Sequence, residues 1–200
     1  MTTDQQNLPQ LLTEIQRCQL CAKLLPCPPK PIVQLNRNAK ILIAGQAPGR
    51  KAHDAGRPFD DASGRRLKQW LGVIDEQFYD PKNFAILPMG FCFPGSYQAH
   101  ETRHGDKPPL PLCAATWRQV VLAQLTNIKL TLLVGKYAIN WHLQAPMTVT
   151  ESVNNWQQLW PKTLVLPHPS PRNNIWLKRH PEFERDVIPQ LKTRVKDLLS

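Results

Sequence analysis

ILIAGQAPGRKAHDAGRPF, residues 41–59, is the stretch that indicates the fold class most directly. Four consecutive apolar residues, Ile41–Ala44, lead into the glycine- and proline-rich sequence GQAPG at 45–49. A short apolar run bounded by glycine and proline predicts a buried strand that ends in a tight loop. Open α/β sheets bind ligands beyond the carboxyl ends of their strands, so this loop is the first candidate for a binding site. An ordinary strand-to-helix turn is the alternative interpretation.

Three further apolar segments predict the rest of a sheet, at 84–87, 130–134 and 164–166. Helical spacing of apolar residues predicts helices near 8–21, 61–72, 114–125, 137–143 and 182–199, the last interrupted at Pro189. Strands that alternate with helices predict a three-layer α/β/α sandwich with a central four-stranded parallel sheet. The loops after parallel strands share one edge, which places GQAPG, GFCFPG (90–95) and HPSPRN (168–173) around a single cleft.

Length and charge constrain the class of protein. Two hundred residues fit one domain, 1–200, in which 1–38 form an N-terminal helix and proline-rich loop and 39–200 form the α/β body. The net charge of +10 favours a polyanionic partner such as nucleic acid. No apolar run approaches the roughly 18 residues that cross a membrane, and the N-terminus lacks the pattern of a signal peptide. We therefore expect a cytoplasmic monomer that does not bind membranes.

The cysteines suggest a metal site. Cys18 and Cys21 form a C-x-x-C pair, whereas Cys92 and Cys113 lie far along the chain. Two close and two distant thiolates can supply four sulfur ligands to an iron–sulfur cluster or to zinc. Buried free thiols are common in proteins and fit the same spacing. Cys27, between two prolines, is the spare thiol in this interpretation.

Three other residues are candidates for a ligand site, each with a plainer alternative. His168 follows a predicted strand in HPSPRNN, where flanking prolines would hold it at the cleft as a hydrogen-bond donor, or where it caps its own turn. Phe59 could stack on a planar ligand or belong to the core. Arg172 could contact phosphate or enter a duplex, or be solvated.

Taken in chain order, these motifs resemble the uracil-DNA glycosylase superfamily, with the iron–sulfur (family 4) branch as the nearest likeness. The order CQLC, GQAPG, GRPF, Cys92, Cys113 and HPSP covers roughly residues 15–180. The resemblance implies an α/β/α fold, a deoxyuridine flipped out of DNA and hydrolysis of its N-glycosidic bond in base-excision repair. It also implies a structural [4Fe-4S] cluster, with zinc as the alternative, on Cys18, Cys21, Cys92 and Cys113.

The resemblance further implies roles for individual residues. Phe59 matches the aromatic that stacks on uracil, and His168 matches the histidine that donates to uracil O2 and stabilises the departing anion. The HPSPRN loop resembles a segment that enters the duplex, with Arg172 as the wedge. The expected substrate-binding set is Gly45, Gln46, Ala47, Phe59, Met89 and His168, and the expected DNA-binding set is Ser170, Arg172 and Asn173.

The chain departs from the family at the positions that handle water. Gln46 stands where family 4 has Glu, and Ala47 stands where other branches have Asp or Asn. Gln46 cannot act as a general base, although its amide can position water; we place it with His168 in the expected catalytic pair. The Asn that reads uracil should fall near Pro88 or Met89, and neither side chain can do so.

Two classes of function follow. The first is a DNA glycosylase that removes uracil or another deaminated or damaged base, with nearby carboxylates at Asp54, Asp60 and Asp61. The alternative is a module on the same fold that binds damaged or single-stranded DNA without chemistry, as the missing carboxylate and Asn suggest. A hydrolase of small nucleobase compounds is a third, DNA-independent reading.

Overall fold

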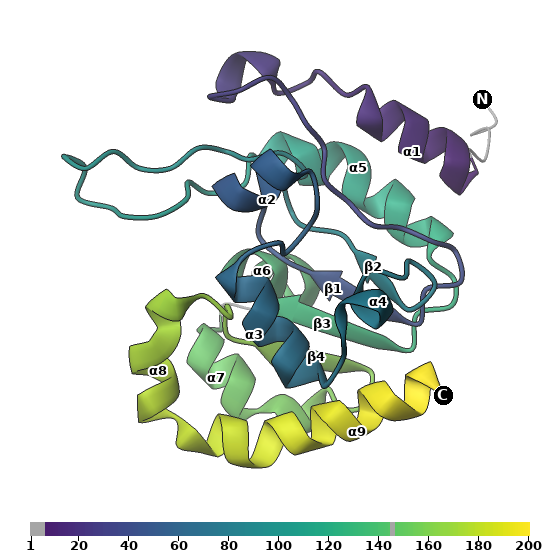
Figure 1. Ribbon diagram of the computed structural model, residues 1–200, viewed down its shortest axis with the longest axis vertical. Coiled ribbons are helices and arrows are strands. Elements are labelled where there is room, and N and C mark those ends of the chain that lie inside the picture. Colours follow the sequence, from purple (N-terminus) through teal and green to yellow (C-terminus); the bar gives the residue numbers. More distant parts are fainter. Residues whose placement is uncertain (1–6, 145–146) are drawn as a thin grey trace.

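The computed structural model describes residues 7–144 and 147–200 and contains a four-stranded, wholly parallel sheet in the order β2-β1-β3-β4 (Figure 1). The strands are β1 (Ile41–Ala44), β2 (Phe84–Ile86), β3 (Leu130–Val134) and β4 (Thr163–Leu166). β1 lies between β2 and β3, with Ile41 opposite both Phe84 and Leu130. Because it is central, β1 is buried on both faces, which explains its uninterrupted apolar run.

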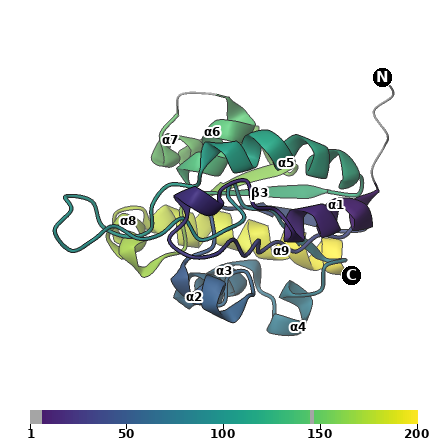
Figure 2. The same cartoon turned by 90° about the horizontal axis from the view of Figure 1, so that it is seen from above.

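Helices cover both faces of the sheet, so the predicted three-layer sandwich is confirmed (Figures 1 and 2). The α-helices are α1 (Leu8–Gln16), α2 (Arg50–Ala55), α3 (Ala62–Leu71), α4 (Asp75–Phe78), α5 (Pro111–Gln124), α6 (Lys136–Leu143), α7 (Val149–Asn154), α8 (Asn174–Arg179) and α9 (Ile188–Leu199). Short 3-10 turns occupy Ala22–Leu24, Trp156–Gln158 and Pro171–Asn173. Seen from above, α3, α4 and α9 lie on one side of the sheet, and α5, α6 and α7 lie on the other (Figure 2).

Alternating side chains of β1 divide the core. Ile41 and Ile43 belong to the larger cluster, which includes Trp70 of α3 and Leu191 of α9. Leu42 belongs to a second cluster, in which α1 packs beside α5. This period of two is the ordinary consequence of strand geometry. The two clusters hold the sheet rigidly beneath the loops that leave its carboxyl edge.

Local signals account for the helix boundaries that were predicted well. Asp61 caps α3 by accepting a hydrogen bond at Oδ1 from the Gly64 amide, 2.8 Å away, and Gly72 ends the helix in the left-handed conformation. The helix predicted over 8–21 is shorter, because α1 ends at Gln16 and the C-x-x-C pair lies in the turn beyond it. A π-helical turn at Phe183–Val187 precedes α9, since Pro189 has no amide hydrogen to continue a regular α-helix.

The segment between β2 and α5 leaves the body as a long hairpin-like loop, drawn in teal in both views (Figures 1 and 2). A single antiparallel bridge joins Ser96 to Asp106 near its base. Across residues 7–144 and 147–200, no helix is long and apolar enough to span a membrane.

Candidate functional site

The carboxyl edge of the sheet carries a cavity of about 490 Å³. The loops after β1 and β4 supply two of its walls, and the segment 58–63, which ends in the first turn of α3, supplies a third. Of the predicted site residues, those that line the cavity are Gly45, Gln46, Ala47, Phe59, His168, Ser170, Arg172 and Asn173. The structure thus brings together residues that lie up to 128 positions apart in the chain, Gly45 and Asn173 being the extremes.

His168 is held as a neutral imidazole with a defined tautomer. Its Nδ1 accepts a hydrogen bond from the backbone amide of Ser170 at 3.2 Å, which leaves the proton on Nε2. Burial lowers the pKa of His168, and the opposing influence of the Asp61 and Asp106 carboxylates is smaller. Asn173 donates from Nδ2 to the His168 carbonyl at 2.7 Å, so the HPSPRN loop is braced from both sides of the histidine. The result is a preorganised N–H donor at the cavity.

Arg66 of α3 is a further brace that the sequence motifs did not indicate. Its guanidinium donates to the carbonyls of Pro169 and Ser170 and, at 2.7 Å, to Oδ1 of Asn174. Arg66 therefore fixes the loop that carries His168. The arginine lies 103 residues before Pro169, and a contact at that separation leaves no local signal.

Phe59 occupies a strained backbone position at the cavity wall. It has a positive φ of 54°, which is unusual for a residue with a side chain. Its ring packs edge-on against Phe78, with centroids 6.2 Å apart, and its ring edge would meet a Cβ at Gly45 at 3.6 Å. The hydroxyl of Tyr79 donates to the Pro58 carbonyl at 3.2 Å and helps to hold this turn. The strain places the ring at the cavity instead of deep in the core.

Gly64 is the residue that permits this turn. A Cβ at Gly64 would lie 1.7 Å from the Phe59 carbonyl oxygen, so no other residue fits without moving Phe59. Gly64→Ala would ordinarily stabilise a helix by up to about 1 kcal/mol, but here we expect a loss of about 2 kcal/mol from overpacking. Denaturant unfolding measures the change. Arg65→Ala, at the exposed next position, is the matched control, and a Gly64→Ala protein as stable as wild type would contradict the expectation.

The long loop between β2 and α5 also reaches the cavity. Asp106 and His104 line it, and Gln46 donates from Nε2 to the Lys107 carbonyl at 3.3 Å. A Cβ at Gly105 would lie 1.7 Å from Nη1 of Arg172, so the arginine side chain lies directly against this glycine. The loop and HPSPRN therefore meet at the cavity, a contact that the sequence did not predict.

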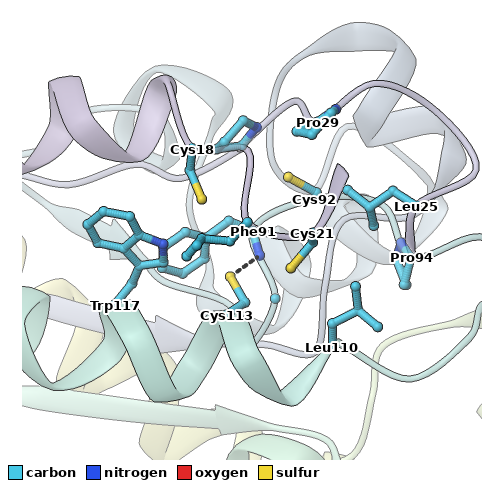
Figure 3. Close-up of a pocket in the computed structure, with 13 residues that line it drawn as sticks. Cys18, Cys21, Leu25, Pro29, Phe91, Cys92, Pro94, Leu110, Cys113 and Trp117 are labelled. Carbon is cyan, nitrogen blue, oxygen red and sulfur yellow. Dashed lines mark hydrogen bonds between the residues drawn. The ribbon is translucent and has the colours of Figure 1, made fainter. Parts of the chain in front are cut away.

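A second pocket lies beside α1 and the start of α5, and all four predicted ligand cysteines line it (Figure 3). The sulfur atoms of Cys18, Cys21, Cys92 and Cys113 turn toward one another around a common space (Figure 3). Burial raises the pKa of Cys92 to about 11 and that of Cys113 to about 12, and the neighbouring thiols add to both shifts. Cys27 lies elsewhere, accepting from Arg50 at 3.4 Å.

The donors around this pocket suit a sulfur-rich group. Its other lining residues are largely apolar and include Leu25 and Leu110, which would keep water away. Nε1 of Trp117 is buried without an acceptor and belongs to the same lining. Within the described parts of the chain, no three or more His, Cys, Asp or Glu side chains are arranged to hold a metal ion. The four thiols thus share a pocket without forming a ready single-ion site.

The segment GFCFPG lies at the thiol pocket and not at the cavity. Pro88 lines the cavity, whereas Gly90, Phe91, Cys92 and Pro94 line the thiol pocket. The prediction that GFCFPG borders the same cleft as GQAPG and HPSPRN is therefore wrong, because only Pro88, two residues before this segment, reaches that cleft. Hydrogen bonds from the Met89 and Gly90 amides to the carbonyls of Gly45 and Gln46, both 2.9 Å, join the two sites.

A comparison with known families decides the relationship. Residues 32–192 match the family model of the Uracil DNA glycosylase superfamily. The chain belongs to this superfamily. The match begins after Cys18 and Cys21, so it does not distinguish the iron–sulfur branch. Among solved structures, the chain is similar to a candidate uracil DNA glycosylase from Methanosarcina acetivorans determined by solution NMR, at 15% identity and a TM-score of 0.49, over 86% of this chain and 98% of that one.

Compared with the expectations for this superfamily, Met89 is the residue that the structure places elsewhere. We expected it to contact the base, but its side chain is 6% exposed, packs in the main core and does not line the cavity. Met89 follows β2 by only three residues, and its backbone bond to Gly45 turns the side chain inward. Pro88 instead presents the β2 loop to the cavity.

A buried arginine supports the β2 loop from the opposite side. Arg118 of α5 is fully buried and donates from Nη1 to the Leu87 carbonyl at 3.0 Å and the Pro88 carbonyl at 3.2 Å. Its Nη2 lies 2.6 Å from Nε2 of His142. Because arginine only donates, Nε2 of His142 must accept, and the imidazole is neutral. Burial and then the Arg118 charge lower the pKa of His142 to about 4.

This pair predicts acid sensitivity of the fold. Unfolded His142 takes up a proton near its ordinary pKa of 6.5, whereas the folded protein resists protonation until about pH 4. The stabilisation is therefore complete above pH 6.5 and is lost as the pH falls toward 4, by about 3 kcal/mol. Denaturant unfolding across this range should show a smaller loss for His142→Gln, whose amide oxygen can still accept from Arg118. His100→Gln, at an exposed site, is the control; equal pH slopes for the two variants would contradict the assignment.

Proposed function

We propose that this protein is a DNA glycosylase that takes a uracil or another deaminated base out of DNA and hydrolyses its N-glycosidic bond. The observation that carries the proposal is the fixed tautomer of His168, with Nδ1 occupied by the Ser170 amide and the proton on Nε2 at the cavity. A neutral N–H donor of this kind stabilises the negative charge that develops on a departing base. Membership of the superfamily supports the same reaction class.

The cavity has the form that such a reaction requires. Phe59 supplies a flat face and His168 a donor, both in one lining, so a base could stack on the first while it accepts from the second. The HPSPRN loop adds Ser170, Arg172 and Asn173 at the rim for contacts with the DNA backbone. The chain has 25 basic and 15 acidic residues, and this surplus of positive charge favours such a polyanionic partner.

We also propose that Cys18, Cys21, Cys92 and Cys113 hold a [4Fe-4S] cluster, as in the iron–sulfur branch. Four sulfurs around one space and a buried Trp117 N–H without an acceptor support a sulfur-rich group. The cysteines of such a cluster bind different iron atoms, which four thiols around one pocket could do, and zinc stays the alternative. When bound, the cluster would act structurally, joining the turn after α1 to the β2 loop and α5. The predicted monomeric state and cytoplasmic location stay predictions.

A panel of labelled oligonucleotides tests the activity. Single- and double-stranded DNA carrying uracil, hypoxanthine or xanthine is incubated with the protein, treated with alkali and examined for strand breaks at the lesion. Breaks at one or more lesions, and none in undamaged DNA, are the expected result. No break at any lesion would overturn the proposal.

The alternative is a module that binds damaged DNA without chemistry. The specific observation in its favour is that Gln46, at a position that handles water in relatives, donates to the Lys107 carbonyl. Lesion-selective, salt-sensitive binding without strand breaks in the same panel would support it.

A further inference from the structure

Hydrolysis of a glycosidic bond needs a water molecule held at the sugar carbon, and a carboxylate is the usual group for this task. This chain has Gln46 and Ala47 where relatives place the water-handling side chain. Among the described residues, only two that line the cavity carry a carboxylate, Asp61 and Asp106. The two other carboxylates expected nearby lie outside it, Asp54 paired with Arg50 at 3.9 Å and Asp60 paired with Arg57 at 3.0 Å.

Asp61 is engaged in building the fold. Its Oδ1 accepts from the Gly64 amide as the N-cap of α3, the helix that supports Phe59. Such a cap stabilises the start of the helix and fixes the orientation of the carboxylate there. Because this hydrogen bond fixes its carboxylate at the helix start, Asp61 is poorly placed to accept a proton from a water molecule.

Asp106 lies against the GQAPG loop instead. Its Oδ1 accepts from the Ser96 hydroxyl at 2.7 Å, which fixes the carboxylate group. Its Oδ2 would be 3.1 Å from a Cβ at Gly49, so the last glycine of GQAPG gives the carboxylate room to approach. One oxygen is therefore braced and the other is directed toward the GQAPG loop at the cavity.

The loop that carries Asp106 is fixed at its base. The Tyr97 amide donates to the Gly105 carbonyl at 2.8 Å, and the Lys107 amide donates to the Gly95 carbonyl at 2.7 Å. Gln46 adds a contact from the opposite side through the Lys107 carbonyl, the residue next to Asp106. Gln46, which stands where family 4 has Glu, thus helps to hold the loop that carries the Asp106 carboxylate.

We propose that Asp106 is the catalytic residue that positions and deprotonates the attacking water, and this inference rests on the proposed glycosylase function. The water oxygen forms a bond to C1′ of the sugar while the bond from C1′ to the base nitrogen breaks. The electron pair leaves with the base, whose anion accepts from Nε2 of His168. The water proton passes to the Asp106 carboxylate, which then releases it to solvent, and the departed base anion takes up a proton from solvent, so the products are the free base and an abasic site.

The test compares cleavage with binding for one variant. Asp106→Asn keeps the acceptor for Ser96 and the size of the side chain but removes the base. We expect the single-turnover excision rate, on a lesion that wild type cleaves, to fall about 100-fold or more. The Kd for a duplex with a tetrahydrofuran abasic analogue should stay unchanged. Formate added to Asp106→Gly should restore part of the rate.

Controls separate the outcomes. Glu101→Gln neutralises another acid of the same loop, one that bonds the Gln98 amide outside the cavity, and should keep the wild-type rate. An Asp106→Asn protein with the wild-type rate, or one that loses binding in parallel with rate, would overturn this inference alone. A loss confined to Asp61→Asn would do the same. A wild-type protein that cleaves no lesion would overturn the proposed function and this inference together.

Discussion

Replacing His168 with alanine is expected to lower the rate of base excision by about 100- to 1000-fold, the usual effect of removing one preorganised donor to a developing anion. The Ser170 amide would lose its acceptor, whereas Nδ2 of Asn173 would keep the backbone carbonyl of residue 168. The fold should therefore persist. Single-turnover excision assays on a lesion that wild type cleaves give the rate.

The rate of excision and the affinity for DNA are measured separately for this variant. The affinity of His168→Ala for a duplex with an abasic analogue should change little, because Arg66 still holds the carbonyls of Pro169 and Ser170 when the imidazole is removed. His100→Ala, at an exposed position of the long loop, should keep the wild-type rate and so exclude a general effect of losing a histidine. Excision by His168→Ala within a few-fold of wild type would contradict the assigned role.

Replacing Cys113 with serine is expected to have the second large effect, on the cofactor and the stability of the fold. The thiol lies at the start of α5, faces three other cysteines and accepts from the Phe91 amide at 3.4 Å (Figure 3). Purified wild type should be brown and contain iron and sulfide, and Cys113→Ser should lose the colour. We also expect a loss of about 4 kcal/mol, which for a domain of this size lowers Tm by roughly 10 °C.

Cys27→Ser is the matched control, since Cys27 contacts Arg50 and does not line the thiol pocket. It should keep both colour and Tm. If the wild-type protein is colourless and contains zinc, zinc and not a cluster occupies the thiol pocket. If the wild-type protein holds no metal and Cys113→Ser is equally stable, both the cluster and the zinc assignments are contradicted.

The sequence was sufficient where the structure depends on neighbours along the chain. Each strand is a short apolar run, and all four strands begin within one residue of prediction, with β1 and β3 matching at both ends. The Asp61 cap and Gly72 marked α3 because capping is a local hydrogen-bond pattern. Parallel strand order then brought GQAPG and HPSPRN together without further information.

The sequence was insufficient where contacts join distant segments. Asp106 reaches Gly49 across 57 positions through a loop whose path has no periodic signal, and Arg66 braces the HPSPRN loop across more than 100. Met89 was assigned to the base by its place in a motif, whereas backbone pairing with Gly45 turned it into the core. The short helices α2, α4, α7 and α8 were missed because four to six residues hold too little apolar periodicity.

Helix α3 contacts two walls of the cavity at once. Gly64 lies against the Phe59 carbonyl, and Arg66, two residues later, holds the carbonyls of Pro169 and Ser170 within the HPSPRN loop. Because α3 is a short helix that packs on α9, this one helix sets the distance between the Phe59 ring and the His168 imidazole. For the cavity to admit a wider base, α3 would therefore have to shift on α9. A movement of either loop alone would not be enough.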